Sequence, residues 1–192
     1  MTLAAAPFLK PGMAYRTRDL AAWSANPPRL AKRLVRDGQL VPLAHGLFLH
    51  PTPSRFGPAP ASDQELMRVF LDGTPFVFTG PERWNALGLG STALFAHPLV
   101  YNTKRSGLFR LGGRSFQLRR VAFPPAPSRE WFAVDLLEHA DQAGTSRVEL
   151  AAALGRSLAS GAFSPGVLAK MVKSYGSKAI QALVQPFLEK VS

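Results

Sequence analysis

Four cationic residues recur along one short stretch of the chain, at positions 29, 32, 33 and 36. The spacing i, i+3, i+4 and i+7 places side chains on one face of an α-helix, so these residues predict a positively charged stripe. Such a stripe can enter the major groove of DNA, where an arginine bound to guanine through two hydrogen bonds contributes about 1–3 kcal/mol of discrimination. The alternative is an ordinary solvated helix face. The residues of the stripe are Arg29, Lys32, Arg33 and Arg36.

The neighbouring residues predict a helix that can hold this stripe. Asn26 is a favourable N-cap, and Pro27 and Pro28 are tolerated in a first turn because a missing N–H costs nothing there. Asp37-Gly38 ends the helix. The face opposite the cations is apolar and can pack against a core; it consists of Leu30, Ala31, Leu34 and Val35.

The segments on either side predict the rest of a winged helix-turn-helix. A short helix capped by Thr17 precedes the basic one, and another is expected over residues 2–9. Gln39 to Leu43 and Leu47 to His50 are strand-like and joined by a turn at His45-Gly46, which makes this hairpin the candidate wing. Arg16, Arg18 and His45 are expected at phosphates or in a minor groove. The predicted DNA-binding set is Arg16, Thr17, Arg18, Arg29, Lys32, Arg33, Arg36 and His45.

Four prolines between residues 51 and 60 predict an extended linker and a domain boundary. We therefore expect a DNA-binding domain over 1–60 and an effector domain over 61–192. In the effector domain, strand-like segments at 75–79, 99–102, 107–111 and 115–121 predict a small, mostly antiparallel sheet. Helical patterns follow the proline-rich break at 124–127 and predict a C-terminal helical bundle. The expected fold class is α+β.

The 192 residues carry a formal net charge of +11, which favours an anionic partner. The charge gathers in two regions: residues 1–60 have a net charge of +6, and residues 97–129 hold seven cations and no acid. The second region can bind RNA, DNA or an acidic protein, or it can be a solvated sheet face paired with acids of the later helices. Its candidate residues are Lys104, Arg105, Arg110, Arg114, Arg119 and Arg120.

Catalytic chemistry finds little support in the sequence. The chain has no cysteine, which excludes disulfides and thiolate chemistry, and its four histidines lack metal-ligand spacing. Asp135, Glu138 and Asp141 suggest a metal-dependent nuclease, yet no nearby lysine completes the motif, so a solvated helix face is favoured. We expect no catalytic residue, metal or cofactor. Without a signal peptide or an apolar run of membrane length, the expectation is a soluble cytoplasmic protein that does not bind membranes.

Three segments of the first fifty residues resemble a known pattern, T-x-x-L, R-L-V-x-x-G-x-L and G-[VL]-[YF], of the N-terminal winged helix of AbiEi-type antitoxins. The later part, with Thr79-Gly80 opening a helix and Val134 to Leu137 before the terminal helices, is similar to the C-terminal part of such regulators. The segments that carry the resemblance are Thr17 to Leu20, Arg33 to Leu40 and His45 to Phe48.

The resemblance implies a bacterial antitoxin of a type IV toxin–antitoxin system. The N-terminal domain would repress its own operon at inverted repeats in double-stranded DNA. The C-terminal domain would counteract a nucleotidyltransferase toxin without forming a stable complex with it. Two alternatives remain open: a winged-helix protein with a nuclease-like C-terminal domain, and a repressor controlled by a small ligand.

Overall fold

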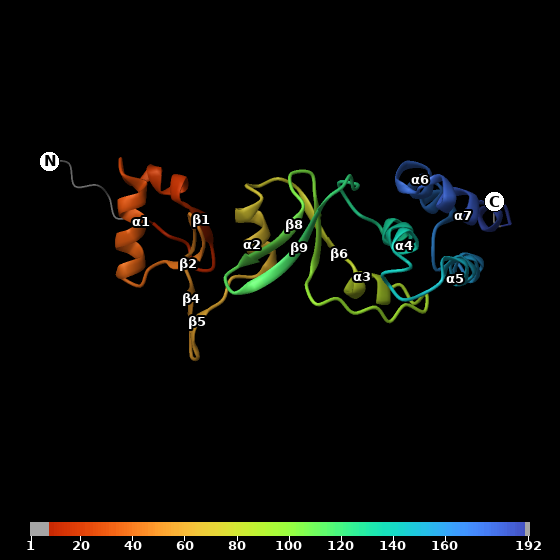
Figure 1. Ribbon diagram of the computed structural model, residues 1–192, viewed down its shortest axis with the longest axis horizontal. Coiled ribbons are helices and arrows are strands. Elements are labelled where there is room, and N and C mark those ends of the chain that lie inside the picture. The colour runs from red at the N-terminus through yellow and green to blue at the C-terminus, as the bar shows by residue number, and fades with distance from the viewer. Residues whose placement is uncertain (1–7, 191–192) are drawn as a thin grey trace. The chain divides into compact units, whose positions relative to one another are not determined.

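The computed structural model describes residues 8–190 and is an α+β fold, with 41% of residues in helices and 20% in strands (Figure 1). The helix expected over residues 2–9 falls almost entirely outside the described residues. Two compact units make up the fold. The first unit is Met1–Phe76 with Leu108–Phe116, and the second is Val77–Gly107 with Gln117–Ser192.

The first unit begins with a three-stranded sheet and two helices. The sheet order is β1-β3-β2, and β3 pairs antiparallel with both neighbours. A helix of the 3-10 type, η1, and the α-helix α1 pack together through buried Leu20, Leu30 and Leu34. The elements are β1 (Ala14–Arg16), η1 (Thr17–Ala22), α1 (Pro27–Arg36), β2 (Val41–Ala44) and β3 (Leu47–Leu49).

The proline-rich stretch after β3 is a β-hairpin and not the extended linker that its composition predicts. Its strands are β4 (Thr52–Ser54) and β5 (Gly57–Ala59), in antiparallel register with Pro53 opposite Pro58. Facing residues of an antiparallel pair alternate between hydrogen-bonded and non-bonded positions, and prolines can occupy the non-bonded one because they have no N–H to donate. The two prolines therefore fit this hairpin instead of preventing it.

The first unit continues through helix α2 (Asp63–Phe70), which is tied to the edge strand β1. The Glu65 carboxylate accepts the backbone N–H of Ala14, and the Arg68 guanidinium donates to the Ala14 carbonyl at 2.9 Å. Side chains of α2 thus satisfy backbone groups of β1 that another strand would otherwise pair. The predicted division at residue 60 stays a prediction, but the compact first unit reaches beyond it.

A four-stranded sheet of order β6-β7-β9-β8 follows. We expected it to be mostly antiparallel, but β7 and β9 are parallel, with Leu99 opposite Gln117 and Asn102 opposite Arg120. Strands β8 and β9 are joined by Gly112-Gly113, both at positive φ, as a tight hairpin turn requires. The strands are β6 (Phe76–Thr79), β7 (Leu99–Asn102), β8 (Gly107–Leu111) and β9 (Arg114–Arg120).

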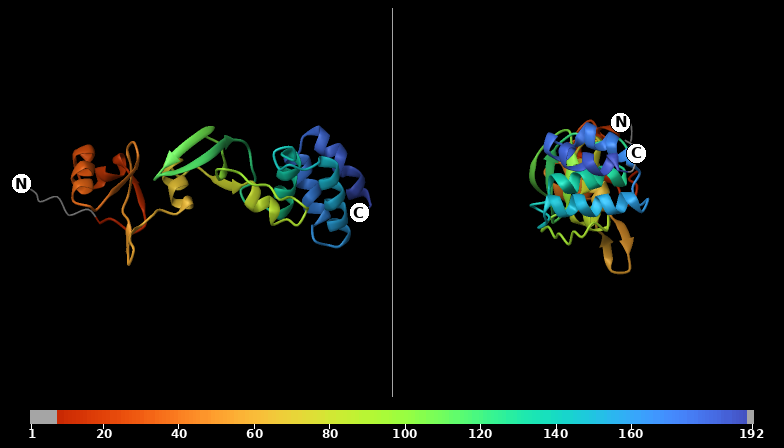
Figure 2. Two further views of the ribbon diagram at one scale, coloured as in Figure 1. Left: turned by 60° about the horizontal axis from the view of Figure 1, so that its bottom comes forward. Right: turned by 90° about the vertical axis from the view of Figure 1, so that its right-hand side faces the viewer.

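Helix α3 (Pro81–Asn85) follows β6, and four longer helices complete the second unit (Figure 2). Ser128, Ser146, Ser164 and Ser177 cap them, each accepting a backbone N–H of the first turn. All four helices contribute to one apolar core that also holds Trp84 and Leu99. They are α4 (Arg129–Glu138), α5 (Arg147–Ala159), α6 (Pro165–Tyr175) and α7 (Lys178–Glu189).

Candidate nucleic-acid interface

Helix α1 presents its cations away from the core, as its sequence predicts. The Asn26 side chain accepts the Arg29 backbone N–H at 3.1 Å, and Gly38 adopts φ +71° just after the last turn. Leu30, Ala31 and Leu34 are buried. The four cations are exposed on the opposite side of the helix, so the helix is amphipathic with one packing face and one charged face.

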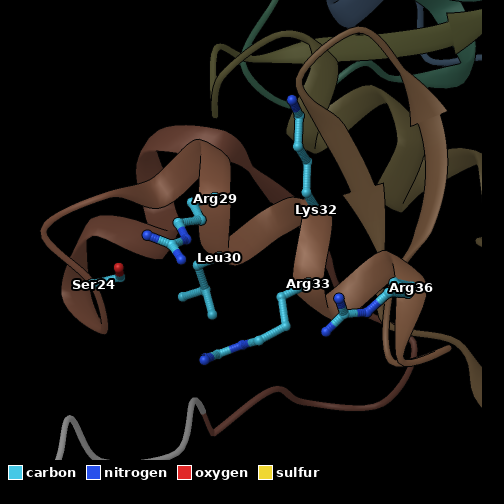
Figure 3. A pocket seen from close by; sticks show the side chains of 6 residues that line it. All are labelled: Ser24, Arg29, Leu30, Lys32, Arg33 and Arg36. Carbon is cyan, nitrogen blue, oxygen red and sulfur yellow. The ribbon is translucent and has the colours of Figure 1, made fainter.

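The exposed face carries a hollow of about 480 Å³ with a mostly cationic lining. In Figure 3 the guanidinium groups of Arg29, Arg33 and Arg36 lie on one side of the helix, and Lys32 points away from them. Arg36 Nε lies 3.3 Å from Asp37 Oδ1, whereas Arg29, Lys32 and Arg33 form no ion pair with any described acidic residue. The face therefore keeps most of its positive charge for a partner. The residues that line the hollow are Ser24, Arg29, Leu30, Lys32, Arg33 and Arg36.

The turn between β2 and β3 lies next to α1 and is held in place by η1. The Thr17 backbone N–H donates to the Gly46 carbonyl at 2.9 Å, and the Thr17 hydroxyl donates to the same oxygen. Thr17 is thus not the helix cap that we expected: Arg16 occupies that position, and its N–H donates to Asp19 Oδ2 at 2.7 Å. The bond to the turn engages the Thr17 hydroxyl and fixes the hairpin beside the helix.

A second hollow, of about 620 Å³, lies between α1 and this hairpin. Its lining is mainly apolar and also includes Lys32 and exposed His45. The lining residues are Thr17, Pro28, Ala31, Lys32, Val35, Pro42, His45, Gly46 and Phe48. The cationic and apolar hollows share Lys32, so the surface combines charge with groups that can contact a thymine methyl.

Two of the predicted phosphate contacts are engaged inside the first unit. Arg16 donates to the carbonyls of Val69 and Phe70, each at 2.8 Å, and lies 3.5 Å from Asp72. Its side chain is only 23% exposed. Because it donates to the last carbonyls of α2, Arg16 serves as a cap for that helix. Arg18 is more exposed but forms an ion pair with Asp72. We therefore leave Arg16 out of the candidate interface and assign Arg18 a secondary place in it.

The second basic region is divided between the two units. Arg110 and Arg114 belong to the first unit, where the Arg114 guanidinium donates to Asp63 at 2.8 Å. Lys104, Arg105, Arg119 and Arg120 belong to the second. The structure thus provides no single surface that unites the six residues within one unit.

Buried Asn102 shapes the loop that carries two of these cations. Its Oδ1 accepts the backbone N–H groups of Lys104 and Arg105, each at 2.8 Å, and its Nδ2 donates to the Arg105 carbonyl at 2.9 Å. Arg119 donates to Gln142 Oε1 at 2.9 Å, whereas Arg120 is exposed at the end of β9. The backbone of Lys104 and Arg105 and the guanidinium of Arg119 therefore have partners within their own unit.

A polar cluster inside the second unit was missed by the sequence reasoning. Asp135, expected on a solvated face of its helix, is only 6% exposed. Its Oδ2 accepts hydrogen bonds from the Thr79 hydroxyl and from Trp84 Nε1 at 2.9 Å, and its Oδ1 accepts one from the Tyr101 hydroxyl at 2.8 Å. His139 Nδ1 lies 3.3 Å from the same Oδ1. The expectation for Asp135 was wrong because tertiary donors compensate its burial; the available indication was an acid within the apolar run 132–137.

This cluster changes the proton affinity of two of its members. Burial and the negative charge of Asp135 raise the pKa of Tyr101, so the phenol stays protonated and donates. Burial alone would lower the pKa of His139, but the hydrogen bonds and charge of Asp135 outweigh it and raise that pKa. The His139 ring also stacks on Trp84, with ring centres 5.7 Å apart. The polar side chains of this cluster are thus bound to one another.

The described residues contain no group of three or more His, Cys, Asp or Glu side chains arranged to hold a metal ion. Within the same part of the chain, no helix is long and apolar enough to cross a membrane. No protein-family model matches the chain, and no curated protein is significantly similar to it.

Proposed function

We propose that this chain is a DNA-binding regulator of the winged helix-turn-helix type, with η1 and α1 as the two helices and the β2–β3 hairpin as the wing. The observation that carries the proposal is the exposed cationic face of α1, opposite its packed face and without described acidic partners at Arg29, Lys32 and Arg33. A ten-residue helix is about 15 Å long, which suits insertion into a major groove.

We further propose that the protein represses its own operon and acts as the antitoxin against a nucleotidyltransferase toxin in a type IV toxin–antitoxin system. The repressor half is supported by the basic face and by the flanking hairpin. The antitoxin half rests on the resemblance to AbiEi-type antitoxins alone. The proposed site residues are Arg18, Arg29, Lys32, Arg33, Arg36 and His45, with bacterial cytoplasm as the compartment.

The repressor is tested by binding to a duplex from the promoter of its own gene. Changing the four α1 cations to Ala should abolish specific binding. The slope of log K against log salt for the residual non-specific binding should be smaller than that of wild type, by about 0.9 for each phosphate that the variant no longer neutralises. A control with the same charge change removes four exposed cations of the second unit and should bind normally. Its substitutions are Arg156→Ala, Lys170→Ala, Lys173→Ala and Lys178→Ala. Equal weakening of binding in both variants would contradict a dedicated α1 interface.

The antitoxin half is tested by co-expression with the nucleotidyltransferase encoded next to its gene. The wild-type chain should restore growth, and the α1 variant should also do so, because the two activities belong to different parts of the chain. A toxin that arrests growth equally with and without the chain would refute this half. This experiment does not test the DNA-binding half, which the duplex-binding assay tests separately.

The nuclease alternative is less well supported, because the carboxylate on which it rests is buried and already accepts several hydrogen bonds. The ligand-controlled repressor retains one favourable observation, the apolar hollow beside α1. A small molecule bound there would occupy part of the proposed DNA surface. It would then raise the melting temperature while weakening DNA binding.

A further inference from the structure

The β4–β5 hairpin projects from the first unit and is stiff for its length (Figure 2). Pro53 and Pro58 face each other across it and restrict its backbone. The Ser54 hydroxyl donates to the Gly57 carbonyl at 2.6 Å and accepts the Phe56 backbone N–H at 3.2 Å. The turn is therefore held by side-chain hydrogen bonds as well as by the strand pairing.

The tip of this hairpin joins a cation to an exposed aromatic ring. Arg55 is exposed, and Phe56, with a relative exposure of 101%, is the most exposed large apolar residue in the described part of the chain. No acidic residue occurs between Asp37 and Asp63, so nothing in the local sequence offsets the Arg55 charge. A rigid tip with this composition suits a partner that is both anionic and able to receive a flat apolar group.

The base of the hairpin adjoins the C-terminal end of α1. A hollow of about 410 Å³ separates Gly38 and Gln39 from the strands of the hairpin, with Pro53 and Pro58 on its far side. His50 Nδ1 lies 2.6 Å from the Gln39 carbonyl and links the two segments. The β2–β3 hairpin shares a hollow with α1 residues from Pro28 to Val35. Both hairpins therefore lie beside α1, and the β4–β5 hairpin adjoins its C-terminal end.

We propose that the β4–β5 hairpin is a second DNA-contacting arm, whose Arg55 and Phe56 enter the minor groove next to the major groove occupied by α1. This inference rests on the proposed function. The minor groove flanks the major groove on each side, and its negative potential attracts arginine. Apolar side chains such as phenylalanine insert between base steps there and partly unstack them. The three-residue strands extend the tip by about 10 Å from the body of the unit.

Charge favours DNA over a second copy of this chain as the partner of the tip. Residues 1–60 have a net charge of +6, so two copies of this region repel each other, whereas a phosphate backbone attracts it. Self-association through Phe56 is therefore the competing outcome in the experiment, and it would overturn the proposal.

The experiment compares the full-length wild type with the double variant Arg55→Ala/Phe56→Ala on a duplex from the promoter of its own gene. We expect the variant to bind about tenfold more weakly, a loss of ~1.4 kcal/mol. Its hydroxyl-radical footprint should lose the protected minor-groove positions that flank the α1 site while keeping the central ones. A matched control, Leu94→Ala/Arg156→Ala, removes one exposed apolar group and one exposed cation elsewhere and should behave as wild type.

A 2-aminopurine placed in the flanking step reports unstacking by Phe56. Its fluorescence should rise when wild type binds and should stay low with Phe56→Ala. Unchanged affinity and footprint in the double variant, while the α1 variant loses binding, would overturn the arm and leave the proposed function intact. Sedimentation that shows a wild-type dimer dissociated by Phe56→Ala, with the footprint unchanged, would likewise overturn it. A wild type that binds no duplex would refute both proposals.

Discussion

Asp135 is the centre of a buried hydrogen-bond cluster in the interior of the second unit. Replacing it with Ala would leave the donors of Thr79 and Trp84 unpaired in a buried site and would leave the Tyr101 hydroxyl only its longer contact with His139 Nε2, at 3.4 Å. An unsatisfied buried donor costs about 1–3 kcal/mol, so we expect Asp135→Ala to lower the free energy of unfolding by about 3 kcal/mol or more. Chemical denaturation of the full-length protein measures this loss.

Asp141 provides the control for this substitution. It lies just beyond the same helix, has an 82% exposed side chain and pairs with Arg147 at 3.2 Å. Exposed ion pairs contribute about 0–1 kcal/mol, so Asp141→Ala should be nearly neutral. Similar losses of unfolding free energy in the two variants would mean that the Asp135 hydrogen bonds stabilise the protein no more than an exposed ion pair does.

The raised pKa of His139 predicts a pH dependence of stability. Because protonated His139 is favoured in the folded state, its contribution is complete below the unfolded pKa of about 6.5 and is lost as the pH rises through the higher folded value. Asp135 favours the charged ring, while burial and Arg119 oppose it. Stability should therefore fall more steeply above pH ~6.5 in wild type than in His139→Gln. Denaturation experiments measure the free energy of unfolding at each pH. Parallel pH profiles for the two proteins would contradict a raised pKa of His139.

At the scale of the elements, the close packing of α5 against α7 requires a glycine at position 155. A Cβ at this position would overlap the Phe187 ring. We expect Gly155→Ala to destabilise the protein by about 1–3 kcal/mol, the usual cost of overpacking, despite the better helix propensity of Ala. Thermal and chemical denaturation measure the change.

A double-mutant cycle shows whether the ring is the cause. Shortening the partner in Gly155→Ala/Phe187→Leu should recover part of the loss, giving a favourable coupling energy. Gly166→Ala is the control, because that position in α6 has open space around it and a compatible φ. It should be neutral or stabilising by up to ~1 kcal/mol. Additive effects in the cycle would exclude the Phe187 ring as the reason.

Local sequence patterns were sufficient for elements whose determinants lie within a few residues. The cap of α1, its two faces and its glycine stop all follow from residues 26–38, and the structure confirms them. The β4–β5 hairpin escaped prediction because its prolines suggest a linker, whereas their cross-strand register makes them compatible with pairing. Helix α7 also continues through Pro186 and ends about one turn later, at Glu189.

Features that depend on distant residues could not be predicted in the same way. The parallel pairing of β7 with β9 joins residues 99–102 to 117–120, although β8 lies between these two strands in the sequence. No local pattern specifies that order. The burial of Asp135 depends on Thr79 and Trp84, more than fifty positions away. The cations of α1 were predictable as exposed residues, but the engagement of Arg16 with α2 was not.

At the scale of the whole molecule, the first unit is incomplete without helix α2. A fragment of residues 1–60 would lack Glu65 and Arg68, which bind both backbone groups of Ala14, and the carbonyls that Arg16 caps. It would also lose the buried apolar face of Leu66 and Val69. The absence of two hydrogen bonds to buried groups costs about 2 kcal/mol, which in a domain of this size lowers the melting temperature by about 10 °C.

The comparison that measures this effect uses fragments 1–60 and 1–76, both of which lack residues 108–116. Fragment 1–76 should melt at the higher temperature by circular dichroism, and Glu65→Gln/Arg68→Gln in that fragment should remove much of the difference. This result would extend the cooperative folding unit to the end of α2, because the edge of β1 is closed by that helix. Identical melting of the two fragments would instead place the folding boundary at the β4–β5 hairpin, where the proline content of the sequence predicts it.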